Sequence, residues 1–210
     1  MNARVTLPFG IEPVAHLGPA ASPPRVVAEW LTGTTIFTIA PLRGQRPICA
    51  ALLADTYGLT WPGTGALSVA GERIAAWNGP GDILLISRNG DLAPDQLAGT
   101  FGEKAAIVDQ SSGRCAIDVS GSDAERMLMK LVEIDVHPAA FKAGMAAVTE
   151  LHHMSIGLYK LAEPSRYLIH CARSYAADVW HCIAEAGSEF GIAMPVNRQG
   201  LREIPRHALK

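Results

Sequence analysis

Three histidines are the first residues whose types could do chemistry. His152 and His153 are adjacent, and with His137 they could offer three imidazole ligands to a metal ion. On a strand, adjacent side chains point to opposite faces of the sheet, so His152 and His153 would not readily reach one ion. We also expect no cysteine or carboxylate at ligand spacing beside them. The pattern therefore predicts polar or interface histidines, and no metal ligand on this chain.

A glycine between two serines, Ser120-Gly121-Ser122, is the next candidate site. It lies between an expected strand and an expected helix, where backbone N–H groups can hold a phosphate. Ser122 and Glu125 are also spaced as a capping box, in which both side chains satisfy the helix's own N–H groups. We predict capping rather than phosphate binding at this position.

Nucleotide and hydrolase motifs are incomplete. Gly63-Thr64-Gly65 follows Trp61-Pro62 instead of a strand and lacks the third glycine of a dinucleotide loop. Asp109, Ser111 and Ser112 could suggest an acid and a nucleophile, but Asp109-Gln110-Ser111-Ser112-Gly113 is typical of a turn. The chain has no nucleophile elbow and no Walker sequence. We therefore predict no catalytic, cofactor-binding or metal-binding residue on this chain.

Composition excludes several classes of protein. Of the 210 residues, 18 are Lys or Arg and 20 are Asp or Glu, and this near-neutral balance argues against a nucleic-acid partner. No apolar run has the roughly 18–20 residues of a membrane helix, and the N-terminus does not resemble a signal peptide. Hence we expect a cytoplasmic protein without membrane contact. The four cysteines show no CxxC spacing and are expected to be buried, reduced thiols.

The sequence pattern of the first half of the chain predicts an α+β module. Residues 1–32 are rich in proline and poor in pattern, but they contain more apolar residues than a disordered linker would, which indicates an extended N-terminal arm. Residues 33–110 form the first predicted module. Its expected elements are strands at 34–39, 67–70, 73–77, 83–87 and 105–108, with helices at 48–57 and 94–101.

The same order of elements recurs in residues 111–191. The expected elements are strands at 114–119, 154–161 and 166–171, a helix from Ser122 to about Val132, and a last helix at about 175–190 capped by Ser174. We therefore predict an α+β fold of two split β-α-β (ferredoxin-like) modules that form a pseudo-duplicated domain. Residues 192–210 form a predicted basic tail.

The C-terminal tail carries a regular series of cations. Arg198, Arg202, Arg206 and Lys210 recur every four residues, but Pro205 opposes a continuous helix. Two interpretations stay open at this point: a solvated tail, and a tail that docks on an acidic partner surface.

Several segments, in a fixed order and spacing, carry a family resemblance. They are Ile48-Cys49-Ala50 to Gly58 before Trp61-Pro62, Trp77-Asn78-Gly79-Pro80-Gly81-Asp82-Ile83-Leu84-Leu85, Asp109-Gln110-Ser111-Ser112-Gly113-Arg114, Val119-Ser120-Gly121 through Ile134-Asp135-Val136, Phe141-Lys142-Ala143-Gly144, and Ala172-Arg173-Ser174-Tyr175-Ala176 through Trp180. Together they cover roughly residues 35–190. This arrangement resembles the gamma subunits of heterotetrameric sarcosine oxidases, whose fold is related to the folate-binding aminomethyltransferases.

The resemblance implies a function in an enzyme complex. Such enzymes oxidatively demethylate sarcosine or a similar N-methyl amino acid. It implies FAD, FMN, NAD and tetrahydrofolate on larger alpha and beta partner subunits, and zinc on a small delta subunit. The gamma chain itself has no recognised catalytic residue, so a structural or assembly role follows.

Two alternatives from other classes stay open. The first is a stand-alone tetrahydrofolate-binding enzyme of one-carbon transfer, which needs an inward carboxylate for the pterin; Asp109, Asp118 and Glu133 are the candidates. The second is a free-standing module that binds an acidic small molecule or protein.

Overall fold

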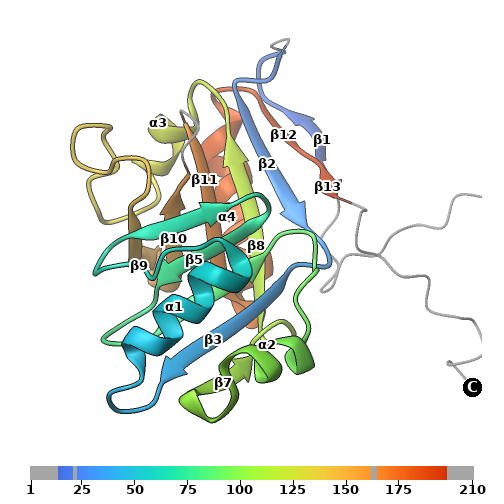
Figure 1. Cartoon of the computed structure of the whole chain (residues 1–210). Helices are drawn as coiled ribbons and strands as arrows, with labels where there is room; N and C mark the ends of the chain where they lie inside the picture. Colours follow the sequence, from blue (N-terminus) through green and yellow to red (C-terminus); the bar gives the residue numbers. More distant parts are fainter. Residues whose placement is uncertain (1–13, 21–22, 162–164, 198–210) are drawn as a thin grey trace, which may run out of the picture.

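Two mainly antiparallel sheets stack face to face, and each has helices on its outer side (Figure 1). The computed structural model describes residues 14–20, 23–161 and 165–197. No helix among them is long and apolar enough to cross a membrane. The basic residues Arg198, Arg202, Arg206 and Lys210 lie outside the described residues.

The smaller sheet contains five strands in the order β4-β5-β6-β3-β7. They are β3 (Thr35–Pro41), β4 (Leu67–Ala70), β5 (Arg73–Trp77), β6 (Ile83–Ser87) and β7 (Ala105–Asp109). The helices α1 (Arg46–Tyr57) and α2 (Pro94–Phe101), with the 3₁₀ turn η2 (Gly102–Lys104), accompany this sheet. These elements confirm the sequence-based expectation closely, including the end of α1 at Gly58, which is left-handed with φ 67°.

The larger sheet has eight strands in the order β1-β12-β2-β8-β11-β10-β9, with β13 also paired to β2. They are β1 (Val14–Leu17), β2 (Val26–Leu31), β8 (Arg114–Ser120), β9 (Ala146–Leu151), β10 (Met154–Lys160), β11 (Arg166–Ala172), β12 (Ile192–Met194) and β13 (Val196–Asn197). The helices α3 (Ala124–Leu128) and α4 (Ala176–Ser188), preceded by the 3₁₀ turn η3 (Arg173–Tyr175), cover its outer side.

The two sheets share one arrangement, which confirms the α+β class and its two similar halves. The order β4-β5-β6-β3 in the smaller sheet corresponds to β9-β10-β11-β8 in the larger one. Beside β3 lies β7, and the equivalent position beside β8 is filled by β2. The second half of the fold thus takes its fifth strand from the N-terminal part of the chain.

Domain boundaries at residues 32/33, 110/111 and 191/192 stay a prediction. Strand β2 was not predicted as a central strand, because Pro23 and Pro24 oppose one, yet it begins only after both. Both of its edges are paired, to β8 on one side and to β12 and β13 on the other. The expected arm and tail therefore contribute strands to the larger sheet.

Two local expectations were wrong, and one strand was missed. Helix α3 ends at Leu128 instead of near Val132, because Val132 forms an isolated bridge with Leu151 of β9. Strand β9 itself was not predicted. The last helix begins at Ala176 after η3, and Ser174 lies inside that turn instead of capping the helix.

Apolar side chains form three layers, one on the outer side of each sheet and one between the sheets, and alternate residues of a strand enter different layers. In β8, Cys115, Ile117 and Val119 face α3 and α4, whereas Ala116 faces the smaller sheet. A third layer of apolar side chains, which includes Ile86 of β6 and Leu168 of β11, fills the space between the sheets. Polar side chains in this space are the exceptions, and they define the candidate site.

Candidate functional site

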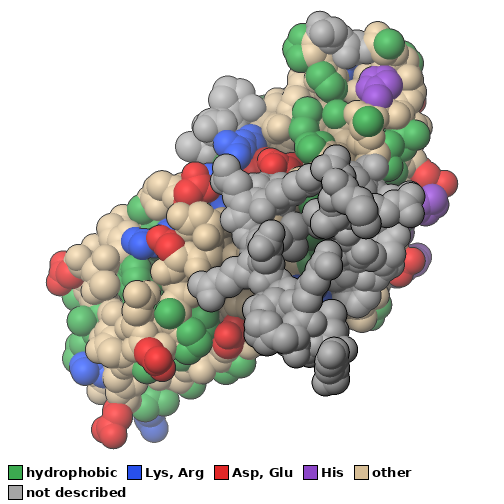
Figure 2. Space-filling model, turned by 90° about the vertical axis from the view of Figure 1, so that its right-hand side faces the viewer, with side chains coloured by type: hydrophobic (Ala, Val, Ile, Leu, Met, Phe, Trp, Pro, Cys, Tyr) green, Lys and Arg blue, Asp and Glu red, His purple; other side chains and the backbone are tan. Residues whose placement is uncertain are grey.

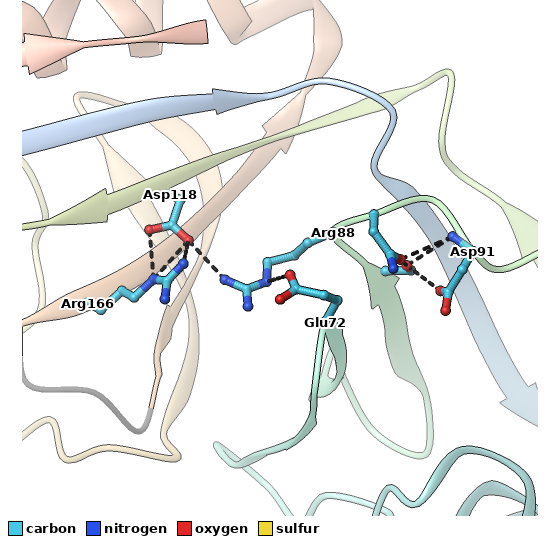
Figure 3. Close-up of polar contacts among 7 residues, drawn as sticks. Glu72, Arg88, Asp91, Asp118 and Arg166 are labelled. Atoms are coloured by element: carbon cyan, nitrogen blue, oxygen red, sulfur yellow. Dashed lines mark hydrogen bonds and ion pairs between the residues drawn. The ribbon is translucent and has the colours of Figure 1, made fainter. Parts of the chain in front are cut away.

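A carboxylate from the larger sheet lies against the smaller sheet, where two guanidinium groups bind it (Figure 3). Asp118 of β8 is 5% exposed. Arg166 of β11 donates from Nε to both carboxylate oxygens at 3.1 Å and from Nη2 to Oδ2 at 2.9 Å. Arg88, which follows β6, donates from Nη1 to Oδ2 at 3.2 Å. We call these three residues with Glu72 the inter-sheet charge network.

Arg88 joins the two sheets through this network. Its side chain is 12% exposed, and its Nε lies 3.0 Å from Glu72 Oε2 in the turn between β4 and β5. Its backbone N–H also donates to the carbonyl of Glu72 at 3.0 Å. The Arg88 side chain is thus held by the smaller sheet and bound at its end to a carboxylate of the larger one. Loss of one partner of a buried ion pair leaves an uncompensated charge on the other, so the pair favours the arrangement that keeps both together.

A second carboxylate, Glu29, lies beside the inter-sheet charge network. It is the strand neighbour of Asp118 across β2 and β8. Partial burial, followed by the negative charge of Asp118, raises the pKa of Glu29, and Arg166 and Arg88 offset this only in part. A carboxyl whose pKa is raised in the folded state lowers the free energy of unfolding at a pH where it is ionised. This cost is absent at low pH, where the carboxyl is protonated in both the folded and the unfolded state.

Glu29→Gln is therefore expected to raise the melting temperature at pH 7 by about 1–3 °C. The gain should shrink as the pH falls through the pKa of Glu29 and disappear below about pH 4. Thermal unfolding from pH 3.5 to 7.5 measures this. Glu72→Gln is the matched control and should give no gain, because Glu72 pairs with Arg88. A gain for Glu29→Gln that persists at low pH would contradict the electrostatic explanation.

A further polar group between the sheets lies around His170 of β11. Arg114 Nη1 lies 3.0 Å from His170 Nδ1, so Nδ1 accepts and the proton is on Nε2. Burial, with the positive charge of Arg114, lowers the pKa of His170 to about 3. His170 Nε2 and the Tyr159 hydroxyl are buried without a hydrogen-bond partner among the described residues. Gly157, directly opposite His170 on β10, leaves the room that the imidazole ring fills.

The three carboxylates considered for a pterin do not come together. Asp118 is bound by two arginines, as described above. Asp109 is exposed at the end of β7 and accepts from the Ser111 N–H at 2.8 Å, as the predicted turn requires. Glu133 is exposed elsewhere. None of these three carboxylates is therefore available to bind a pterin inside the fold.

The histidine expectations need a correction. His152 and His153 form the turn between β9 and β10, with φ of 45° and 68°, and are not on a strand. His153 lies close to Glu150 and Glu133, and their ligand atoms fall within 4.8 Å of one another. A carboxylate partner is therefore present, contrary to expectation. His137 is not part of this group, and its Nδ1 accepts from the Ala139 N–H. All three members are exposed, and such groups are common without an ion.

The expected capping box is also absent. Asp123 is the residue before α3, and no side chain caps that helix. Ser122 instead donates to Asp123 Oδ2 at 3.3 Å, and Asp123 pairs with Arg25 and Arg126.

Gly63-Thr64-Gly65 precedes β4 and opens no helix, as predicted. The expected burial of cysteines holds for Cys49, Cys115 and Cys171, whereas Cys182 is half-buried, and all four are thiols.

Comparisons with known proteins agree on one family. A family model described as "Sarcosine oxidase, gamma subunit family" matches residues 43–189. The chain is 33% identical over 144 residues to sarcosine oxidase subunit gamma of Corynebacterium sp. (strain P-1), covering 67% of this chain and 70% of the relative. It is 31% identical over 143 residues to the same subunit of Arthrobacter sp., again covering 67% and 70%.

Solved structures show the same fold. The heterotetrameric sarcosine oxidase from Corynebacterium sp. U-96, in complex with pyrrole 2-carboxylate, contains a chain similar to this one with a TM-score of 0.69 and 24% identity; the match covers 83% of this chain and 88% of that chain. The glycine cleavage system aminomethyltransferase T from Bartonella henselae matches with a TM-score of 0.58 and 11% identity, covering 84% of this chain and 49% of that chain. The sheet arrangement is thus that of a folate-binding-type fold.

Proposed function

The chain belongs to the sarcosine oxidase gamma subunit family, and from this premise we propose that it is the non-catalytic gamma subunit of a heterotetrameric flavoenzyme. The reaction of the complex is the oxidative demethylation of sarcosine or a similar N-methyl amino acid. The role of this chain is structural: it is a rigid subunit on which the complex assembles.

The observation that carries the structural role is the inter-sheet charge network. Its four residues all lie within the segment that matches the family, residues 43–189. A carboxylate that acts as a general acid or base must lie within hydrogen-bond reach of the proton that it transfers. Asp118 instead accepts hydrogen bonds from Arg166 of its own sheet and from Arg88, which links it to the smaller sheet. Its geometry supports a positioning role.

Cofactors and partners follow from the same proposal. FAD, FMN, NAD and tetrahydrofolate would be held by the larger alpha and beta subunits, and zinc by a small delta subunit. The reaction's redox chemistry is thus supplied by the partner subunits, and this chain's own residues keep its two sheets in a fixed relation. We also propose a cytoplasmic location, because four free thiols fit a reducing compartment.

The surface in Figure 2 fits a protein partner better than nucleic acid. On the face in view, acidic and basic side chains are scattered among apolar and other surface, and neither charge forms a continuous patch on the described residues drawn there. Nucleic-acid binding needs a basic face that neutralises several phosphates. Mixed apolar and polar surfaces are typical of protein interfaces.

Purification of the tagged full-length chain from its native cells tests the proposal. We expect a yellow complex that contains two larger chains and one very small chain, and that oxidises sarcosine or a related N-methyl amino acid. The same cells without the tagged chain are the control for non-specific capture. A colourless monomer of 22.3 kDa would contradict the proposed subunit role.

A further inference from the structure

Two cysteines lie directly opposite each other on neighbouring strands of the larger sheet. Cys115 of β8 and Cys171 of β11 are strand partners, and both face the helical side. Their Sγ atoms are 3.2 Å apart, and the two side chains are 5% and 1% exposed. The other cysteines are elsewhere: Cys49 is on α1, with its side chain in the core of the smaller sheet, and Cys182 is on α4.

The backbone geometry suits a bond between these two sulfur atoms. Directly opposed residues in an antiparallel pair have Cα atoms about 4.5 or 5.5 Å apart, and both values lie in the range that a disulfide spans. A disulfide needs an Sγ–Sγ distance of about 2.05 Å. The change from 3.2 Å therefore requires small side-chain rotations and no shift of strand register.

The surroundings favour a thiolate on Cys115. The Arg173 guanidinium lies at this end of β8, where it donates from Nε to the Ser112 carbonyl at 2.7 Å and from Nη2 to the Arg114 carbonyl at 3.4 Å. Hydrogen bonding from Cys171, with the charge of Arg173, lowers the pKa of Cys115, and the same contact raises the pKa of Cys171. Cys115 is thus suited as the attacking sulfur and Cys171 as its thiol partner.

The pair lies near one end of both strands, where local opening would admit a small oxidant. Cys115 is the second residue of β8, next to the half-buried Arg114 and the exposed Gly113. Opening of this strand end would expose the sulfur atoms without unfolding the sheet, because strand ends open more readily than strand centres.

From these contacts we propose that Cys115 and Cys171 form a reversible oxidation site, at which a hydroperoxide converts the two thiols into a cross-strand disulfide. The Cys115 thiolate attacks hydrogen peroxide, the O–O bond breaks and Cys115 becomes a sulfenic acid, while the leaving hydroxide takes up the proton lost from the thiol and departs as water. The Cys171 thiol then attacks the Cys115 sulfur, the S–S bond forms and water leaves. Overall, two thiols lose two protons and two electrons, and hydrogen peroxide is reduced to two water molecules. This inference does not depend on the proposed function.

Peptide mass spectrometry of the full chain, purified with any partner subunits it retains, tests the proposal. The sample is treated with hydrogen peroxide, and free thiols are then alkylated under denaturing conditions. We expect one cross-linked peptide pair that joins Cys115 to Cys171, with a mass about 2 Da below the sum of the reduced peptides. Dithiothreitol should restore both alkylation sites.

Two variants make the result specific. Cys182→Ser keeps the pair and should retain the cross-link, whereas Cys171→Ser should lose it and leave Cys115 to be oxidised further. Alkylation of both Cys115 and Cys171 after a treatment that fully oxidises the half-buried Cys182 would overturn the proposal. A cross-link from either residue to Cys49 or Cys182 would overturn it as well.

Discussion

Replacement of Asp118 by asparagine is expected to lower the free energy of unfolding by about 3–5 kcal/mol, the typical effect of breaking a buried ion pair. The substitution keeps the size of the side chain but removes its charge. Arg88 and Arg166 would then lose the carboxylate that their guanidinium groups share between the sheets. Urea-induced unfolding, followed by circular dichroism at neutral pH, measures the change.

Glu72→Gln is the matched control for Asp118→Asn. Glu72 pairs with the same Arg88 at 3.0 Å, but its side chain is 52% exposed, so its loss should cost less than about 1 kcal/mol. Equal effects of the two variants on the free energy of unfolding would show that burial does not determine how much these ion pairs contribute to stability. A double variant of Asp118→Asn with Arg88→Met adds a further check: its cost should be less than the sum of the single costs, because one of the two cations that share Asp118 is removed with it.

Local sequence signals were sufficient for most of the smaller sheet. The β-branched run before Pro41 predicts β3, and helical spacing followed by Gly58 predicts α1 and its end. The hairpin β4–β5 and the buried run of β6 were also predicted, since their partners follow closely in the chain. Such elements depend on interactions between near neighbours, which a periodicity analysis can detect.

Elements that depend on distant partners were missed. Strand β2 pairs with β8 and with β12, which lie far along the chain, so its own six residues do not reveal how it is used. For the same reason α3 was predicted too long, because the bridge from Val132 to Leu151 has no local signal.

The candidate site shows the same limit. Asp118 was identified as a notable carboxylate, but its partners could not be found from sequence. Arg166 lies 48 positions away and reaches Asp118 because β11 pairs with β8, whereas Arg88 lies 30 positions away and reaches it only through the stacking of the two sheets. The proximity of Cys115 and Cys171, 56 positions apart, likewise follows from strand pairing and not from spacing.

Gly157→Ala is expected to destabilise the chain by about 2–3 kcal/mol, because it overfills the space between the sheets. A methyl group at this position would overlap His170 Nε2 and Cδ2 and approach the Tyr159 oxygen to 2.9 Å. The imidazole ring cannot move away cheaply, since it is 2% exposed and bound to Arg114. Gly99→Ala in α2 is the control: its Cβ meets no atom within 4 Å, and alanine favours a helix, so we expect a gain of about 0.5–1 kcal/mol.

The steric cause of the Gly157→Ala effect can be separated from a backbone cause by changing His170. In a His170→Ala background, which removes the ring over Gly157, the alanine at position 157 should cost less than about 1 kcal/mol. The coupling between the two positions, measured by urea unfolding of all four variants, is then about 2 kcal/mol. An unchanged cost of Gly157→Ala in both backgrounds would contradict a steric role of the ring. A large coupling would instead mean that Gly157 is needed because it lets a neutral histidine pack between the two sheets.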